Sequence, residues 1–528
     1  MSVFDNFEQM KRDRSPHERV WGDCLDYTYP RRSGGFKGSQ ITTEEAANTK
    51  ARLSDSTATD GSRTLAAAIM SGMTPANSLW VGYDVPGASL GRDDRAWLDG
   101  AARTVWRNIH SGTWDADGYE TVLDTVCAGW GAIYIDAHPQ GGFRFVRWPI
   151  SQVYLASSQP ENIPDIVYRS FSLTAAQAVG HFGEAVGRDI LLAHKSGSTD
   201  RFEFLHAIEP REGKRGPFAK NMPYASIKAS LHDKRVLAEG GYNEMPVIVP
   251  RWMAMPDGPY ADGPVFEALP DIKRLNELKR MELAAADIAV GGMWVAVDDG
   301  VVNPRTLKVG GRVVIPVTNT DNIKELRSGQ QFTVSEYMIN GMQRQIRRVL
   351  MADQLEPRDG PAMTATEVHA RMGLVRQLLG PVYGRLQAEL LGPLVVRCFG
   401  IAQRAGALGD MPANLSGRSA SIVYLSPLAR AQKLEEVSAI ERLFVYATGI
   451  GQAYPQALDV LDPDTAVRLV GESLVVPHQV LRSEEAVTNL RAERSEEQES
   501  QDPAAQELLM KGAKTAVSKA AANMVPEQ

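Results

Sequence analysis

Residues 265–297 read VFEALPDIKRLNELKRMELAAADIAVGGMWVAV, and this stretch decides the fold that the sequence predicts. Its first part, Val265–Ala289, has the composition of a long helix. The apolar residues recur at every third position: Leu269, Ile272, Leu275, Leu278 and Met281. Because an α-helix has 3.6 residues per turn, a period of three drifts by about 60° per step and spirals around the helix. Such a helix needs neighbours on several sides, either from its own chain or from copies of that chain.

The residues that follow predict a small β module and then a second helix. Met293–Val297 and Arg312–Val317 have strand-like composition, and Asp298-Asp299-Gly300 after the first is a turn sequence rather than a paired-carboxylate site. Thr333-Val-Ser-Glu336 has the form of a capping box and predicts the start of a helix at about residue 335. The apolar stripe of that helix is Ile339, Met342, Ile346 and Val349. The sequence therefore predicts a projecting hairpin of helix, β module and helix.

An irregular segment and a long helix come next. Two prolines and a glycine exclude a helix from residues 353–363. A second capping box, Thr364-Ala-Thr-Glu367, predicts the start of the longest helical pattern in the chain. Gly380-Pro381 and Gly392-Pro393 interrupt that pattern. Proline removes a hydrogen bond and clashes with the preceding turn, so each pair predicts a kink.

The remainder of the chain predicts an α+β unit before the hairpin and helices after it. Helix-like runs cover residues 61–72, 93–110 and 119–127, and a short helix begins near Thr174. Strand-like runs cover residues 132–136, 143–148, 153–155, 166–171, 202–208, 226–232 and 247–252. Residues 1–60 are polar with weak periodicity. Residues 427–491 predict further helices, and residues 491–502 predict a solvated helix or a loose linker.

Composition limits the classes of protein that the chain can belong to. It has 528 residues, 57 basic against 64 acidic side chains and a net charge of −7. Tight sequence-independent binding to nucleic acid relies on excess Lys and Arg, so it is not expected here. The cysteines are three and far apart, which predicts free thiols: Cys24, Cys127 and Cys398. The first residues lack the apolar core of a signal peptide, and no uninterrupted apolar run reaches 18 residues. We therefore expect a soluble chain made in a cytoplasm.

A search for catalytic motifs finds none that predicts an enzyme. The sequence has no GxxxxGK[ST] phosphate loop, no HExxH and no GxSxG, and none of its nine histidines is paired with Cys or another His at metal-ligand spacing. No catalytic residue, cofactor or metal is therefore expected. The best local basic cluster is Arg344, Arg347 and Arg348. It is either a solvated or ion-paired helix face, or a surface that transiently contacts phosphates.

Four stretches of sequence, in order between about residues 50 and 495, carry a family resemblance. They are Ser54–Trp80 with LAAAIMSGMTP, Met363–Leu394 with MTATEV and LLGPV, Ser426–Gln432 with SPLARAQ, and Val476–Glu485 with RSEE. These stretches resemble the head-to-tail connectors, or portal proteins, of short-tailed bacteriophages. The resemblance does not cover the first 50 residues or the tail after residue 495.

The resemblance implies an α+β portal fold with long kinked helices, an antiparallel-strand wing, a helix–β clip–helix insert and a helical C-terminal crown. By position, residues 1–262 would form the N-terminal part of the wing, and residues 364–430 the long kinked helix with the rest of it. The other parts would be stem helices at 263–289 and 335–352, a clip at 290–334, a channel loop at 353–363 and a crown with its tail at 431–528.

The resemblance also implies partners and a place in the virion. It implies a ring of twelve copies at the portal vertex of the capsid, assembled in the host cytoplasm with no membrane partner. The expected partners are the major capsid and scaffolding proteins, the terminase large subunit, a tail adaptor protein and double-stranded DNA in transit. The DNA-channel candidates are Arg344, Arg347, Arg348, Gln354, Glu356, Arg358 and Asp359. The docking candidates in the clip are Asp298, Asp299, Arg305, Lys308 and Arg312.

Two other classes of protein remain open at this point. One is another virion structural protein, such as an adaptor or a scaffold, although adaptors are usually much shorter and lack a helix–β tip–helix insert. An enzyme acting on nucleic acid would need a carboxylate or histidine cluster for metal-assisted hydrolysis, and no such cluster stands out in the sequence.

Overall fold

The computed structural model describes residues 2–37, 43–85, 91–211, 221–291, 294–296, 323–325, 332–355, 380, 382–415, 421–424, 427–451, 454–473, 480–482 and 484–501. The chain divides into two compact units. Unit 1 comprises residues 1–81 and 103–409, and unit 2 comprises residues 82–102 and 410–528. Helices and antiparallel sheets occur together, so the predicted α+β class is confirmed.

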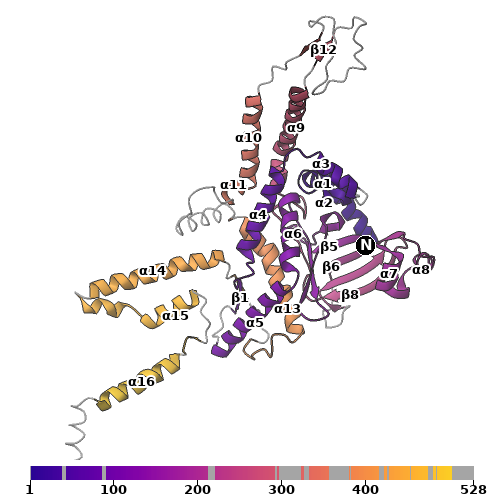
Figure 1. The fold of residues 1–528 in the computed structure, drawn as a ribbon. Helices are drawn as coiled ribbons and strands as arrows, with labels where there is room; N and C mark the ends of the chain where they lie inside the picture. Colours follow the sequence, from indigo (N-terminus) through magenta and orange to yellow (C-terminus); the bar gives the residue numbers. More distant parts are fainter. Residues whose placement is uncertain are drawn as a thin grey trace, which may run out of the picture. The chain divides into compact units, whose positions relative to one another are not determined.

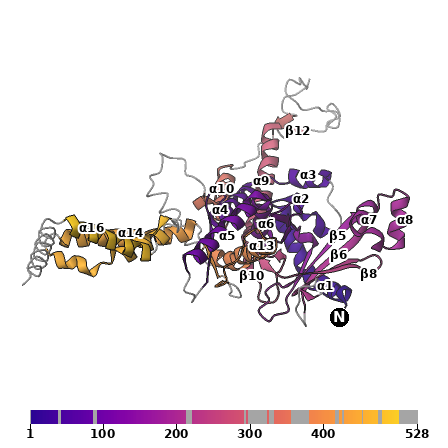
Figure 2. The ribbon, with the colours of Figure 1, turned by 90° about the horizontal axis from the view of Figure 1, so that it is seen from below.

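A five-stranded antiparallel sheet is the largest β element of unit 1 (Figure 1). Its spatial order follows the sequence: β4 (Val153–Ala156), β5 (Ile166–Thr174), β6 (Arg201–Pro210), β7 (Tyr224–Ser230) and β8 (Arg235–Tyr242). Alternate residues of β6 serve opposite faces of the sheet, as the pleat requires. Leu205 belongs to the core shared with helix α1 (Val3–Asp26), whereas Phe204 belongs to the core under α7 (Ala175–Phe182) and α8 (Arg188–Lys195). The sheet is thus covered by helices on both sides (Figure 2).

Helix α1 was not predicted by the sequence analysis. It runs for 24 residues and begins with a capping box, in which the Ser2 hydroxyl accepts from the Asp5 amide and the Asp5 carboxylate accepts from Ser2. Its buried residues recur at helical spacing, but Arg14 is one of them at 1% exposure. The Arg14 guanidinium donates to the carbonyl oxygens of Val153 at 2.6 Å and Ser151 at 2.8 Å, so this charge ties α1 to the edge of the sheet.

A three-stranded sheet and a group of helices form the rest of the unit 1 core. The sheet has the order β3 (Phe143–Arg147), β2 (Ile133–Ala137) and β9 (Val247–Ile248). Helix α6 (Trp114–Ala128) packs against β3 and against α4 (Thr57–Met73), while α5 (Arg92–Ser111) has residues in both units. Three aromatic rings meet in the centre, where Trp21 lies 5.4 Å from Trp130 and 4.9 Å from Tyr260 between ring centroids. The remaining short elements are α2 (Pro30–Ser33), α3 (Thr43–Ala51), β10 (Met253–Ala254) and β11 (Ala261–Asp262).

The strands predicted between residues 132 and 252 are largely confirmed, with two differences. The predicted strand at residues 247–252 is shorter, because only Val247–Ile248 pair with β2. β8 was not predicted, since its sequence carries Arg235, Glu239 and two glycines and therefore lacks an apolar alternation. The helix that was expected to begin near Thr174 does so, with Thr174 and Gln177 forming a capping box.

The helix that continues to Arg404 contains a widened turn near its second Gly-Pro pair. Residues Gln387–Leu391 are π-helical, and α13 (Gly392–Arg404) follows directly. Because Pro393 lacks an N–H, a local i→i+5 turn is one way to absorb the missing hydrogen bond. The regular α-helical pattern is thus interrupted just before residues 392–393, and the kink expected there stays a prediction. The first part of the predicted helix, residues 364–379, lies outside the described residues, as does the kink expected at Pro381.

Unit 2 consists mainly of helices. They are α14 (Pro427–Gly451), a 3₁₀ segment at Pro455–Val460, α15 (Pro463–Ser473) and α16 (Glu484–Gln501). Val85, Leu98 and Leu415 form a small core, and β1 (Val81–Asp84) pairs with β14 (Ser421–Tyr424). The sequence predicted helices for residues 427–491, and for residues 491–502 it left open a solvated helix or a loose linker; the structure has a helix there as far as Gln501. Among the helices that the structure describes, none combines the length and apolar character that crossing a bilayer requires.

A buried histidine in β6 predicts a dependence of stability on pH. Burial lowers the pKa of His206 to about 3. An unfolded chain takes up this proton near its ordinary pKa of about 6.5. The stability that the neutral ring contributes is therefore complete above about pH 6.5 and is lost as the pH falls toward the folded value. We expect His206→Gln to remove a slope of up to about 1.4 kcal/mol per pH unit from the free energy of unfolding.

Urea unfolding between about pH 7 and 4 measures this slope. His138→Gln is the matched control, because His138 lies exposed in the hairpin loop between β2 and β3. The control should keep the slope of the unsubstituted protein. An equal slope for all three proteins would show that His206 does not titrate as its burial requires.

Candidate functional site: the helical hairpin and its base

Two long helices and a β tip form the hairpin that the sequence predicted. Helix α9 (Pro264–Gly291) and helix α10 (Phe332–Val349) lie side by side (Figure 1). The tip contains an antiparallel pair of β12 (Trp294–Ala296) and β13 (Ile323–Glu325). Helix α10 begins three residues earlier than the Thr333 capping box predicted. The strand predicted at residues 312–317 lies outside the described residues, and β13 was not predicted.

Burial changes along the hairpin from its base toward its tip. On α9, Leu269, Ile272 and Leu275 are at most 8% exposed, whereas Met281 is 55% exposed. The apolar stripe therefore begins inside unit 1 and ends on the outside of the hairpin. Further large apolar side chains are exposed on both helices, among them Leu283 at 57%, Tyr337 at 75% and Met338 at 46%.

Asp55 joins both helices of the hairpin to helix α4. Its carboxylate is 6% exposed and accepts from the Thr57 amide at 2.8 Å, which caps the start of α4. The same carboxylate accepts from Gln343 Nε2 of α10 at 2.7 Å and lies 3.7 Å from Lys279 Nζ of α9. Asn276 of α9 adds a second link, since its Oδ1 accepts from the Asp55 amide at 3.2 Å. We call these residues the hairpin junction.

The contacts of the hairpin junction predict that removing the Asp55 carboxylate destabilises the protein. Asp55→Ala would leave the Thr57 amide and the Gln343 side chain without their acceptor. We expect the free energy of unfolding to fall by about 2–3 kcal/mol, because hydrogen bonds to a buried charged group contribute more than neutral ones. Asp60→Ala on the same helix is the control, because Asp60 is half exposed and its pair with Arg63 contributes less than about 1 kcal/mol. Equal effects of the two substitutions in urea unfolding would contradict the role of the junction.

The three predicted channel arginines share one exposed face of α10. Arg344, Arg347 and Arg348 are separated by three and four positions and are all exposed. Arg344 Nε donates to the Asn340 carbonyl oxygen within the same helix at 3.2 Å. The described structure thus gathers three guanidinium groups on the outside of the hairpin, close to its base.

The other predicted site residues do not lie on this arginine face of α10. Gln354 lies in a short helix, α11 (Ala352–Leu355), so the expectation that residues 353–363 contain no helix is wrong at its first three positions. The break before it comes at Met351, whose φ of 56° ends α10. The other candidates lie outside the described residues: Glu356, Arg358, Asp359, Asp298, Asp299, Arg305, Lys308 and Arg312.

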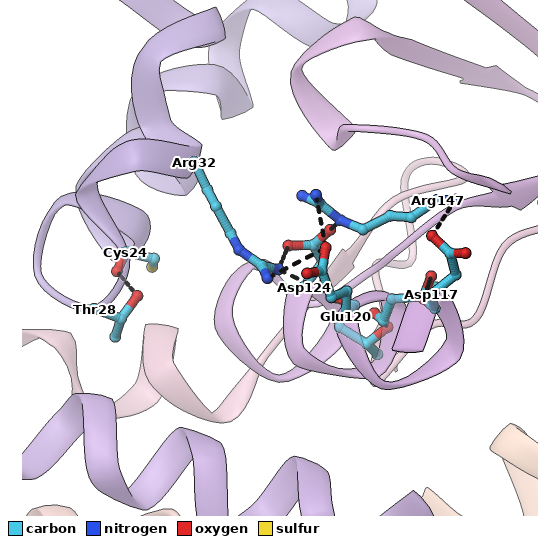
Figure 3. Close-up of polar contacts among 9 residues, drawn as sticks. Cys24, Thr28, Arg32, Asp117, Glu120, Asp124 and Arg147 are labelled. Carbon is cyan, nitrogen blue, oxygen red and sulfur yellow. Dashed lines mark hydrogen bonds and ion pairs between the residues drawn. The ribbon is translucent and has the colours of Figure 1, made fainter. Parts of the chain in front are cut away.

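A buried cluster of charged side chains surrounds Asp124 of α6 (Figure 3). Asp124 of α6 is fully buried and accepts from Arg32 Nη1 and from Arg147 Nε, each at 2.6 Å. Glu120, one turn earlier, lies 3.3 Å from Arg147 and 3.7 Å from Arg32. Burial alone would lower the pKa of Arg32, but the Asp124 carboxylate outweighs it and raises that pKa. The cluster links α2, α6 and β3, and sequence spacing could not reveal it.

The three cysteines are buried free thiols, as predicted. Burial raises the pKa of Cys24 and of Cys127 to about 12, and it also raises the pKa of Cys398. Because the thiolate is the reactive form, none of these side chains suits nucleophilic or redox chemistry.

One group of side chains in the described part of the chain could hold a metal ion by distance alone. His232 Nε2 lies 3.6 Å from Asp189 Oδ2 and 3.9 Å from Asp233 Oδ1. His232 and Asp189 are exposed, and acidic groups commonly gather on surfaces without a metal ion. No metal function follows from this group.

Comparison with known proteins identifies the class to which this chain belongs. Residues 2–481 match the family of bacteriophage head to tail connecting proteins. The chain belongs to this family, whose description is of a structural, connecting role, and the resemblance found in the sequence is confirmed. The match also takes in the first 50 residues, which the sequence motifs left uncovered.

Two named phage proteins are similar to this chain over most of its length. The portal protein of Salmonella phage epsilon15 is 27% identical over 539 aligned residues, which cover 96% of this chain and 93% of the relative. The probable portal protein of Bordetella phage BPP-1 is 24% identical over 539 aligned residues, covering 97% of this chain and 94% of the relative.

Proposed function

We propose that this chain is a phage portal protein, a component of the virion at the capsid vertex where head and tail are joined. Membership of the head to tail connecting family carries this proposal, together with two relatives that are named portal proteins and are matched over nearly their full length. Twelve copies close into a ring whose central channel passes double-stranded DNA during packaging and ejection.

The exposed apolar side chains of the helical hairpin support the proposal of a ring. Met281, Leu283 and Tyr337 leave apolar surface exposed on a projecting element, and large exposed apolar surfaces usually mark a contact with another molecule. In the proposed ring, α9 and α10 are the stem helices and pack against the stem helices of neighbouring copies. The spiral of apolar residues along α9 suits neighbours on several sides.

The other parts of the proposed portal fold are those that the family resemblance implies by position along the chain. Residues 1–262 and 364–430 form the wing, residues 290–334 form the clip, and residues 431–528 form the crown. The antiparallel sheets of unit 1 suit the wing, and the β12–β13 pair suits a clip at the tip of the stem. The clip docks the terminase large subunit during packaging and an adaptor of the tail afterwards, while the wing and crown meet capsid and scaffolding proteins.

Charge favours sliding of DNA over tight binding. The chain carries a net charge of −7, so a ring of its copies repels phosphate overall. A few arginines on α10 centre the duplex without holding it, since each additional phosphate contact would add to the barrier against movement. The proposed channel-lining residues are Arg344, Arg347 and Arg348 with the segment at residues 353–363.

Packaging by altered phage tests this assignment. Replacing residues 354–359 by Gly-Ser, or the three α10 arginines by alanine, should leave rings intact and reduce the amount of DNA packaged or retained. Arg280→Ala is the control, because Arg280 is an exposed arginine of α9 that pairs with Glu277 on its own helix. Full genomes packaged and retained by both altered proteins would contradict the assignment of these residues to the channel.

A further inference from the structure

One face of the five-stranded sheet in unit 1 carries a row of basic residues. Arg169 of β5, His206 of β6 and Lys228 of β7 lie directly opposite one another in register. This is the face on which Phe204 packs under α7 and α8, because alternate residues of a strand share a face. Side chains in directly opposite positions lie about 4.5–5.5 Å apart at Cβ, and like charges there are destabilising. The row therefore needs a source of negative charge.

Two further basic residues lie at the rim of this row. His181 is exposed near the end of α7, and Arg144 is exposed on β3. Partial burial lowers the pKa of His181, and Lys228 and Arg144 lower it further. The Asp136 carboxylate lies opposite Arg144, but it already accepts from the Tyr134 hydroxyl at 2.7 Å. We call the five basic residues of the row and its rim the basic cluster: Arg144, Arg169, His181, His206 and Lys228.

The centre of the basic cluster lacks a compensating carboxylate. Burial lowers the pKa of His206 most. Three basic neighbours add to this effect and bring that pKa to about 3: Lys228, Arg169 and His181. Burial also lowers the pKa of the Arg169 guanidinium, to about 10. Among the residues that the structure describes, no acidic group contributes to either shift. At neutral pH the His206 ring is therefore uncharged, and Arg169 and Lys228 are cations without a counter-ion.

Both cations keep hydrogen-bond donors for a ligand. Arg169 Nε donates to Gln152 Oε1 at 3.0 Å, but the two terminal nitrogens of Arg169 have no acceptor within the described part of the chain. The Lys228 ammonium likewise has neither a hydrogen bond nor an ion pair to a described residue. The Arg169 guanidinium lies over the Trp148 ring, 5.2 Å from its centroid. This contact holds the guanidinium in place but does not neutralise its charge.

We propose that the basic cluster binds a free oxyanion of the phosphate class between Arg169 and Lys228. Strands β5 and β7 are two strand spacings apart, about 10 Å, which these two long side chains can span together with one tetrahedral anion. Arg offers a fork of N–H donors and Lys a point charge, and both bind phosphate oxygens. Because His206 is 7% exposed and Arg169 is half-buried, the centre suits a small ion and not a nucleic-acid duplex. The inference concerns one copy of the chain and does not rest on the proposed ring.

Calorimetric titration of the full-length protein with inorganic phosphate, in chloride buffer at constant ionic strength, tests the site. Lys228→Met and Arg169→Met each remove one charge and keep an unbranched side chain. We expect either substitution to weaken phosphate binding at least about tenfold, because each removes a hydrogen bond between charged groups. Lys195→Met is the matched control, since Lys195 is an exposed lysine of α8 outside the basic cluster. The control should bind phosphate as tightly as the unsubstituted protein does.

Thermal unfolding gives a second readout that a purely structural role of Lys228 would not produce. In chloride, Lys228→Met should be at least as stable as the unsubstituted protein, because it removes a charge that has no carboxylate partner. In phosphate the order should reverse, because a ligand that binds only the folded state stabilises that state. Phosphate stabilises folded proteins in general, so the two proteins are compared with each other in the same buffer.

Three results would overturn the proposal. The first is phosphate that binds to all four proteins equally or to none of them. The second is binding of sodium glutamate, but not of phosphate, that depends on Lys228, which would show that the ligand is a carboxylate of a protein. The third is binding of a short DNA duplex, but not of free phosphate, that depends on Lys228, which would show that the ligand is a nucleic-acid backbone. The proposed portal function would stand in each case.

Discussion

Replacing Asp124 by alanine is expected to lower the free energy of unfolding by about 3–5 kcal/mol, the cost of removing one partner from a buried ion pair. Asp124 is fully buried and its two carboxylate oxygens each bind one arginine at 2.6 Å. After the substitution, Arg32 and Arg147 would keep their charges at 16% exposure with only the half-exposed Glu120 nearby. Urea unfolding followed by circular dichroism at fixed protein concentration measures the loss.

Glu120→Ala is the matched control for Asp124→Ala. Both carboxylates lie on one face of α6 and meet the same two arginines, but Glu120 is 47% exposed and its contacts are 3.3 and 3.7 Å long. Water competes for an exposed pair, so the control should cost less than about 1 kcal/mol. A loss below about 1 kcal/mol for Asp124→Ala as well would show that the buried cluster does not stabilise unit 1.

Gly129→Ala is expected to cost about 2–5 kcal/mol, through a strained backbone and a clash together. Gly129 ends α6 with a φ of 94°, in the left-handed region that a Cβ disfavours. A Cβ there would lie 2.6 Å from the carbonyl carbon of Asp262 and closer still to the carbonyl oxygen of Ala261. Both contacts are backbone atoms of β11, so no side chain can turn away to relieve them.

Gly141→Ala is the control that separates backbone strain from the steric clash. Gly141 has a φ of 96°, but nothing lies within 4 Å of the position of its Cβ. It should therefore show the backbone cost alone, about 1–2 kcal/mol. Equal losses for the two substitutions would mean that the close approach of β11 to the end of α6 adds nothing. The expected difference is measured by the same unfolding experiment.

The sequence predicted the elements whose formation depends on residues close to one another in the chain. The Thr174 capping box, the strands between residues 132 and 232 and the helix–β–helix order of the hairpin all depend on neighbours within a few positions. Periodicity failed for α1 because a buried Arg14 interrupts its apolar stripe. That guanidinium pairs with Glu18 one turn later at 3.0 Å, but it also donates to two carbonyl groups more than 130 residues away, which no local pattern contains.

The candidate site was predictable in part. The exposed arginine face of α10 followed from spacing, whereas the drift of the apolar period of α9 left open whether its neighbours come from its own chain or from copies of it. The hairpin junction did not follow from the sequence, because Asp55 and Gln343 are 288 positions apart. The local signal of the junction was Asp55, two residues before the start of a helix at Thr57. An aspartate there predicts a helix cap, but it does not predict that the same carboxylate also accepts a hydrogen bond from Gln343.

The central claim is that copies of this chain close into a ring around a channel. Electron microscopy of the purified full-length protein, with the particle mass measured by light scattering on the same sample, tests it most directly. The account predicts closed rings of twelve copies with a central hole. Single protomers or open filaments, both in the purified sample and at the vertex of assembled particles, would contradict it.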